Sequence, residues 1–353
     1  MHWRSALLAG LISLSAATCG LADDFMVQTG ELDGVLYTLA VPEDWNGKLL
    51  LQAHGSRSVD MPLLADLDMK DAANLALVKD GWLIAYSSYR RNGPIVTDAA
   101  LDLLALRGHV ADAFGEPELV LVEGWSMGAV VAAMLAEDHA DLVDGVCGVG
   151  AMFSIPIPGE DVEFSRRPGV PVLLLSNMGE PKDAREYCVA AGAAGAPAAY
   201  WMIGRYGHVN LNSEERLVAL RALEAWASGG EAPEQRELLV DMTHDSVARR
   251  ADGVASAVVL SVHAAYGNVR TEFVPDDLAW LGVVQGGNCR VETPGASVVA
   301  RYGKSHMDAK PGGWVIFPDA EGYLTIARNR ARAVDMLGSE VDDTIRLSAA
   351  EPR

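Results

Sequence analysis

The sequence predicts an α/β protein with a doubly wound, mostly parallel sheet, followed by a smaller, mostly β, barrel-like domain. Up to about residue 228, apolar strands alternate with segments of helical periodicity. Residues 229–236 are rich in Gly, Glu, Ala and Pro. From Val254 onward the segments are short, β-branched and interrupted by turn residues. We therefore expect one domain over residues 23–230 and a second over residues 231–353.

The elements of the first domain follow from the spacing of its apolar residues. Strands are expected at residues 35–41, 48–53, 82–87, 119–123, 143–149, 170–175 and 198–203, and helices at 69–79, 98–114, 127–137 and 213–227. Asn212 and Glu215 suit a capping box before the last helix, which Gly229-Gly230 ends. Such alternation forms a parallel sheet covered on both faces, with functional side chains at the carboxyl ends of its strands.

Composition and charge narrow the classes of function. Half of the residues are hydrophobic and 22% are charged, as is usual for globular proteins. The formal net charge is -20. A surface this acidic repels phosphate backbones and anionic lipid, so we expect neither nucleic acid nor a membrane as a partner.

The N-terminus has the pattern of an export signal over residues 1–22. Arg4 is the only charged residue before Asp23, and residues 6–17 form a short apolar run. Gly20-Leu21-Ala22 supplies the small residues of a cleavage site after Ala22. The run is too short to span a bilayer, and Thr18 is an unusual residue before a lipidated cysteine such as Cys19. We expect a periplasmic or extracellular protein.

Cys147, Cys188 and Cys289 remain after that cleavage. In an oxidising compartment one disulfide is conceivable, with Cys147–Cys188 as the best pair. The cysteines have no CxxC spacing, so a metal or redox site has no support.

Gly124-Trp125-Ser126-Met127-Gly128 follows an expected strand and opens an expected helix, which is the setting of a nucleophile elbow. The turn is so tight that the residues two positions before and after the serine must be small, and both are glycines. It lifts the serine hydroxyl above the sheet beside a helix N-terminus. Ser126 is therefore the candidate nucleophile. A serine here argues against dehalogenase or epoxide hydrolase chemistry, which needs a carboxylate.

His208 is the candidate base, because a serine hydroxyl is a weak nucleophile until its proton is removed. It lies in Arg205-Tyr206-Gly207-His208, after the last expected strand of the sheet and before a helix. A histidine there reaches over the strand ends to Ser126. The chain order of serine, acid and histidine also fits.

The acid that orients the imidazole is expected in the loop after residue 175. Glu180 is the better placed, Asp183 is the alternative, and Asp161 is a third candidate after the preceding strand. The negative charge of the intermediate needs two backbone donors. We expect the amide of Met127 and the amide of Ser56, with Gly55 letting the backbone turn toward the site. The side chain of His54 is expected to be structural.

Residues 31–230 resemble the α/β-hydrolase superfamily, and within it secreted bacterial esterase-like members. The likeness is carried by the elbow and by Val41-Pro42, Trp45-Asn46-Gly47, His54-Gly55, Ser88-Tyr89-Arg90-Arg91-Asn92-Gly93 and Gly207-His208 before a helix that contains Trp226. Gly179-Glu180-Pro181 is similar to the Gly-Asp-Pro segment in which such enzymes carry their acid. The connection between residues 152 and 170 is too short for a sizeable cap domain.

The second domain resembles the C-terminal β domain of S-adenosylmethionine hydroxide adenosyltransferases. The matching stretches are Tyr266-Gly267-Asn268-Val269, Thr271, Gly303, Gly312, Gly322-Tyr323-Leu324-Thr325-Ile326-Ala327-Arg328-Asn329, Leu337-Gly338 and Asp343-Thr344-Ile345. In that family the domain forms half of a nucleoside site at a trimer interface. The family's N-terminal domain is absent, and Arg270 and Glu272 depart from its pattern, so we favour assembly or substrate presentation over nucleotide binding.

The resulting hypothesis is a secreted serine hydrolase that cleaves carboxylic esters through an acyl-enzyme. It needs no cofactor and no metal, and its partners would be a small-molecule or polymeric ester and, through the second domain, further copies of itself. Peptidase or thioesterase activity on the same residues is the alternative. A catalytically silent hydrolase scaffold that works as a binding or assembly protein is the alternative of a different class.

Overall fold

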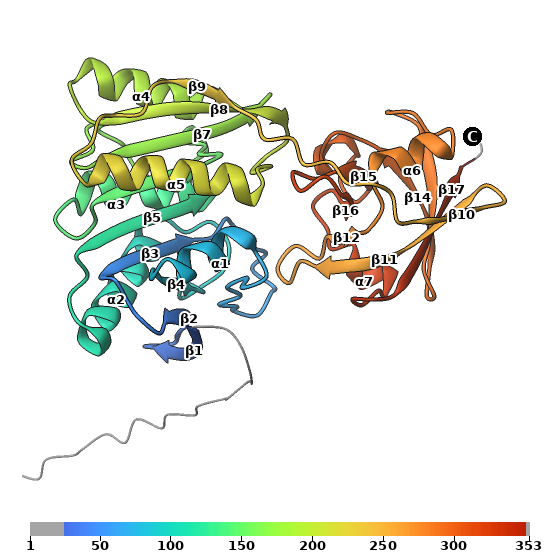
Figure 1. Ribbon diagram of the computed structural model, residues 1–353. Helices are drawn as coiled ribbons and strands as arrows, with labels where there is room; N and C mark the ends of the chain where they lie inside the picture. Colours follow the sequence, from blue (N-terminus) through green and yellow to red (C-terminus); the bar gives the residue numbers. More distant parts are fainter. Residues whose placement is uncertain (1–24, 351–353) are drawn as a thin grey trace, which may run out of the picture.

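The computed structural model describes residues 25–350, and in it the chain forms two β-sheets with their own helices (Figure 1). Over these described residues the first sheet has nine strands and the second has eight. The predicted α/β domain followed by a β-barrel domain is confirmed. The predicted signal peptide and its cleavage after Ala22 lie outside the described residues. Within residues 25–350, no helix is long and apolar enough to cross a bilayer.

The first sheet is mostly parallel, with its reversed strands at one edge. Its strand order is β1-β2-β4-β3-β5-β6-β7-β8-β9. The β1/β2 and β2/β4 pairs are antiparallel and the others are parallel. The strands are β1 Phe25–Leu32, β2 Val35–Pro42, β3 Lys48–Ala53, β4 Leu83–Ser87, β5 Leu119–Trp125, β6 Gly145–Val149, β7 Val172–Met178, β8 Ala198–Tyr206 and β9 Arg236–Leu238.

In the described part of the chain, five helices cover the two faces of this sheet. They are α1 Ala72–Lys79, α2 Thr97–Phe114, α3 Met127–Asp138, α4 Asp183–Ala193 and α5 Ser213–Ala227. Neighbouring residues of a strand point to opposite faces, so Leu49 packs in one apolar core and Leu50 in the other. The core of Leu49 lies under α2, α3 and α4, and that of Leu50 lies under α1 and α5.

Three elements of the first domain, β1, α4 and β9, were not predicted from the sequence. The predicted start of α1 at residue 69 is also too early. The carboxylate of Asp71 accepts hydrogen bonds from the amides of Ala73 and Asn74, so the helix begins at Ala72. The capping box of Asn212 and Glu215 is present at α5. Strand β9 pairs with β8, so the first sheet continues past residue 230, where we expected the domain to end.

The three cysteines within residues 25–350 do not pair. Cys147, Cys188 and Cys289 are free and buried. Cys147 belongs to the core on one face of the sheet and Cys188 to the core on the other, so the sheet itself separates them. The Cys188 thiol instead contacts the carbonyl of Ala199 at 3.2 Å. The disulfide that we considered is therefore wrong.

The second sheet closes into a barrel. Its order is β10-β11-β12-β16-β15-β14-β13-β17, and β17 also pairs with β11. The strands are β10 Arg249–Ala251, β11 Val254–Val262, β12 Val269–Thr271, β13 Asn288–Glu292, β14 Ser297–Tyr302, β15 Trp314–Pro318, β16 Leu324–Arg328 and β17 Thr344–Ala349; the helices are α6 Pro275–Trp280 and α7 Val334–Leu337. A separate apolar core fills this barrel.

Candidate active site

Ser126 lies on the turn from β5 to α3 with φ 55° and ψ -118°, a conformation that non-glycine residues rarely adopt. The turn leaves no space for side chains around it. A Cβ atom built on Gly124 would lie 2.1 Å from the carbonyl oxygen of Gly128. One built on Gly128 would lie 1.9 Å from the carbonyl oxygen of Ala53. The glycines on each side of the serine are therefore required by close backbone contacts.

His208 joins Ser126 to Glu180. Its Nε2 lies 2.8 Å from Oγ of Ser126, and its Nδ1 lies 2.5 Å from Oε1 of Glu180. A ring that carries its proton on Nδ1 donates to the carboxylate and leaves Nε2 free to accept the serine proton. The side chain of His208 is 23% exposed and that of Glu180 only 5%. Residue 150 must be small, because a Cβ atom built on Gly150 would lie 3.0 Å from Oε1 of Glu180 and 3.0 Å from Cε1 of His208.

Of the three candidate acids, Glu180 is the one that contacts His208. Gly179, with φ 84°, turns the chain so that the Glu180 carboxylate folds back over the strand end. Oε2 of Glu180 then accepts the amide of Asn177 at 2.5 Å. Asp183 instead begins α4, and its carboxylate accepts the amide of Ser154 at 2.8 Å. Asp161 is exposed in the connection between β6 and β7.

Met127 and Gly55, from the two segments expected to supply backbone donors, lie next to Ser126. Met127 is the first residue of α3, so its amide has no acceptor within the helix. Gly55 lies against the nucleophile, since a Cβ there would be 3.2 Å from Cβ of Ser126. Gly55 is not among the residues with positive φ, so close approach rather than turning freedom requires this glycine. Ser56 follows it and is exposed.

His54 fixes the orientation of that loop. Its Nδ1 lies 2.6 Å from the Gly55 carbonyl oxygen, and its ring stacks on Tyr89 at 4.1 Å. In a planar trans peptide, holding the Gly55 carbonyl also sets the opposite direction for the N–H of Ser56. Burial, together with the nearby charge of Arg57, lowers the pKa of His54 to about 4, so the ring is neutral near pH 7.

A buried ion pair supports the elbow, and sequence reasoning missed it. Glu123 lies at the end of β5, and its carboxylate accepts two hydrogen bonds from Arg216 of α5, at 2.8 and 2.6 Å. Arg216 also donates to Asp71 at 2.6 Å and lies over the ring of Trp125, 5.3 Å from its centroid. The sequence did contain a signal for this ion pair: Glu123 is a single carboxylate inside an apolar strand, and a buried carboxylate needs a partner of opposite charge.

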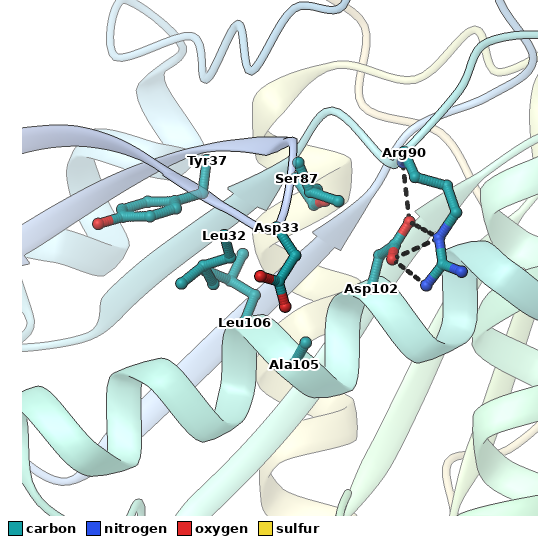
Figure 2. Close-up of a pocket in the computed structure, with 9 residues that line it drawn as sticks. Leu32, Asp33, Tyr37, Ser87, Arg90, Asp102, Ala105 and Leu106 are labelled. Atoms are coloured by element: carbon teal, nitrogen blue, oxygen red, sulfur yellow. Dashed lines mark hydrogen bonds and ion pairs between the residues drawn. The ribbon is translucent and has the colours of Figure 1, made fainter. Parts of the chain in front are cut away.

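Two cavities lie apart from these residues. One of about 370 Å³ lies between the β1–β2 hairpin and α2, where Arg90 binds Asp102 (Figure 2). The other, of about 730 Å³, lies between the domains, and Tyr206 and Lys304 are among the residues that line it. Ser126 lines neither cavity. Within residues 25–350, His, Cys, Asp and Glu side chains form no cluster of three or more that could hold a metal ion.

The strand order and the reversed edge strands, with an elbow after β5, define the α/β-hydrolase fold. No protein-family model matches the chain. It is 33% identical over 133 residues to an o-phthalyl amidase of Xanthobacter agilis. That match covers 36% of this chain and 27% of the amidase, so the chain spans about a quarter of the length of that relative.

Solved structures give distant matches. An esterase of Pyrococcus furiosus is 17% identical with a TM-score of 0.42, over 58% of this chain and 88% of that one. An esterase from the bacterial hormone-sensitive lipase family is 15% identical with a TM-score of 0.42, over 52% of this chain and 76% of that one. The resemblance of the second domain to the adenosyltransferase domain stays a prediction.

Proposed function

We propose that this protein is a serine hydrolase that cleaves carboxylic esters through an acyl-enzyme. The observation that carries the proposal is the continuous path from Oγ of Ser126 through the ring of His208 to Glu180, with contacts of 2.8 and 2.5 Å. In serine hydrolases this arrangement lets the base take the hydroxyl proton as the oxygen attacks the substrate carbonyl.

In the proposed mechanism Ser126 attacks the ester carbonyl and His208 takes its proton. Glu180 holds the ring and stabilises its positive charge. The amides of Met127 and Ser56 bind the negative oxygen of the tetrahedral intermediate. His208 then gives the proton to the leaving alcohol, and water attacks the acyl-enzyme by the same steps in reverse.

Amide hydrolysis is a second candidate, because the curated relative is named an amidase. The same acyl-enzyme forms from an amide, but the leaving nitrogen must be protonated as the bond breaks, which places more demand on His208. A p-nitrophenyl ester and a p-nitroanilide of the same acyl group would measure the preference. We expect turnover of the ester to be faster.

We also propose that the protein acts outside the cytoplasm on small-molecule or polymeric esters. The pattern of residues 1–22 supports export, and the net charge of -20 argues against nucleic acid and anionic membranes as partners.

The test is Ser126→Ala, assayed with an activated aryl ester. We expect turnover to fall at least about 10³-fold, because the nucleophile is lost, while circular dichroism and melting temperature stay close to those of the parent. A fluorophosphonate probe should label the parent and Ser228→Ala, an exposed serine at the end of α5, but not Ser126→Ala. If the probe labels neither the parent nor the control, the alternative of a catalytically silent scaffold is favoured. Activity that survives Ser126→Ala would refute the assignment of Ser126 as nucleophile.

A further inference from the structure

Tyr266 brings a hydroxyl of the second domain to the Gly55–Ser56 loop, which lies against Ser126. It lies on the turn between β11 and β12, and its Oη donates to the carbonyl of Ser56 at 3.4 Å. A Cβ atom built on Gly55 would lie 3.1 Å from this Oη and 3.2 Å from Cβ of Ser126. The phenol and the nucleophile therefore flank the same glycine of the oxyanion loop.

The turn that carries Tyr266 is fixed within its own domain. The amide of Gly267 donates to the carbonyl of His263 at 2.7 Å, and Gly267 itself has φ 64°. The guanidinium of Arg332 donates to the carbonyls of Ala264 and Ala265 at 2.6 and 2.7 Å. These contacts hold the backbone that carries Tyr266, which lowers the cost of ordering its side chain when substrate arrives.

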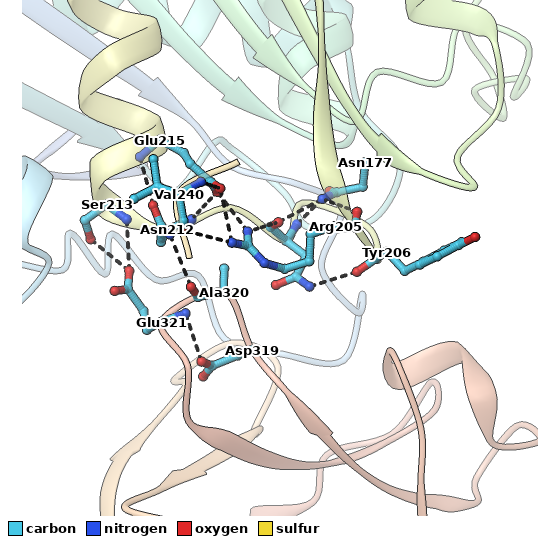
Figure 3. A network of polar contacts seen from close by, with 11 residues as sticks. Asn177, Arg205, Tyr206, Asn212, Ser213, Glu215, Val240, Asp319, Ala320 and Glu321 are labelled. Atoms are coloured by element: carbon cyan, nitrogen blue, oxygen red, sulfur yellow. Dashed lines mark hydrogen bonds and ion pairs between the residues drawn. The ribbon is translucent and has the colours of Figure 1, made fainter. Parts of the chain in front are cut away.

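The second domain is also fastened to the segment that follows His208. Glu321, on the connection from β15 to β16, accepts the amide of Ser213 at 2.9 Å and its hydroxyl at 3.0 Å (Figure 3). Asn212 donates to the carbonyl of Ala320 at 3.3 Å. Since Ser213 begins α5 directly after the histidine loop, the base and the second domain share an anchor.

The chemistry of Tyr266 suits a hydrogen-bond donor to a negative oxygen. Although 42% of the residue is exposed, desolvation at the domain contact raises the pKa of its hydroxyl, and Asp66 raises it further against the opposing effect of Arg57, so the phenol keeps its proton near neutral pH. Its contact with the Ser56 carbonyl, at 3.4 Å, is longer than a normal O–H···O hydrogen bond. The hydroxyl can therefore turn to a charged acceptor at little cost.

We propose that Tyr266 is a third donor to the oxyanion, so that the two domains together form the catalytic centre. This rests on the proposed function. When Ser126 attacks, the electrons of the carbonyl π bond move to its oxygen, and the Tyr266 hydroxyl donates to that oxygen beside the amides of Met127 and Ser56. The phenol proton stays on Tyr266 throughout, and the serine proton goes to His208.

The experiment is Tyr266→Phe, which removes the hydroxyl and keeps the ring. One buried oxyanion donor contributes about 10²–10³-fold to kcat, and Tyr266 is 42% exposed, so we expect a loss of about 10-fold or more. KM should stay within about twofold, since the bond strengthens only in the transition state. Tyr323→Phe, in the same domain and stacked on His244, is the matched control and should behave as the parent.

A second measurement separates this role from folding or domain docking. An aryl trifluoromethyl ketone forms an oxyanion on the serine, so its affinity for Tyr266→Phe should fall by the same factor as kcat. Unchanged kcat in Tyr266→Phe, a change in KM alone, or undiminished ketone affinity would each overturn the proposal. If one of these results is found while turnover still depends on Ser126, only the role of Tyr266 is refuted. If Ser126→Ala keeps its turnover, the proposed function itself is refuted.

Discussion

Glu180 is held by both of its oxygens, and this makes it a rigid partner for the histidine. One oxygen lies 2.5 Å from the His208 ring and the other accepts the Asn177 amide. Asn177 in turn binds the loop of the base: its side chain donates to the carbonyl of Asn210 at 2.8 Å and accepts the amide of Asn210 at 2.8 Å. Hydrogen bonds therefore connect the loop of Glu180 directly to the loop of His208.

Substitution of Glu180 and of Asp183 should show which of the two carboxylates orients His208. In Glu180→Gln the amide can no longer balance the charge of the imidazolium, and we expect kcat on an aryl ester to fall about 10³–10⁴-fold. Asp183→Asn alters only a contact to the Ser154 amide and should stay within about threefold of the parent. Steady-state kinetics of the two variants, with melting temperatures to exclude unfolding, decide the matter. The reverse ranking would make Asp183 the acid.

The β5–α3 turn is the element on which the proposed site depends. The strand ends in apolar core, the helix begins at Met127, and the backbone between them passes within contact of the end of β3. Buried Glu123 and Arg216 brace the turn from the opposite side of the sheet. Breaking such a pair leaves a buried charge without compensation, so this network stabilises the elbow as long as both members are present.

Alanine substitutions at two glycines should have opposite effects. Gly128→Ala places a methyl group 1.9 Å from the Ala53 carbonyl oxygen, and we expect at least about 2 kcal/mol lower stability together with loss of turnover. Gly108→Ala, in the middle of α2 with no atom within 4 Å of the added carbon, should raise stability by about 0.5–1 kcal/mol and keep activity. Urea unfolding measures both. Equal effects would mean that the elbow has more space than the structure gives it.

The two domains meet next to the segment that follows His208 and at the loop of Gly55 and Ser56. The barrel touches the histidine side through Glu321 and Ser213, and the serine side through Tyr266 and Ser56. Lys304 adds a third contact, with its ammonium 4.6 Å from the ring centroid of Tyr206, two residues before the base. The first domain lacks a cap between β6 and β7, and the barrel occupies one side of the site in its place.

Loss of the Glu321 anchor should loosen this arrangement. Its carboxylate binds the free amide at the N-terminus of α5, where negative charge is favoured, and we expect Glu321→Ala to cost about 1–2 kcal/mol. Hydrogen exchange should rise at the Ser213 amide and in residues 239–248, and kcat should fall. Glu340→Ala, an exposed carboxylate of the same domain, is the control. Parent-like exchange in Glu321→Ala would mean that the domains are held by other contacts.

Local physical chemistry was enough to predict most elements of the first domain, the elbow and His208 from the sequence. Apolar periodicity located most strands and helices of the first domain, because burial of one face imposes that spacing. The elbow was recognisable because a tight strand-to-helix turn admits only small neighbours, and chain order then pointed to His208. The structure brings Oγ of Ser126 and Nε2 of His208 to 2.8 Å although the residues lie 82 positions apart in the chain.

Contacts between distant parts of the chain settled what local patterns left open. Glu180 and Asp183 lie three residues apart, and the turn at Gly179 directs the first of them to His208. The separation of Cys147 from Cys188 by the sheet, the closure of the barrel by β11 and β17, and the approach of Tyr266 to Ser56 likewise depend on how whole layers pack. Packing of layers is set by the summed burial of many side chains, so no short stretch of sequence carries it.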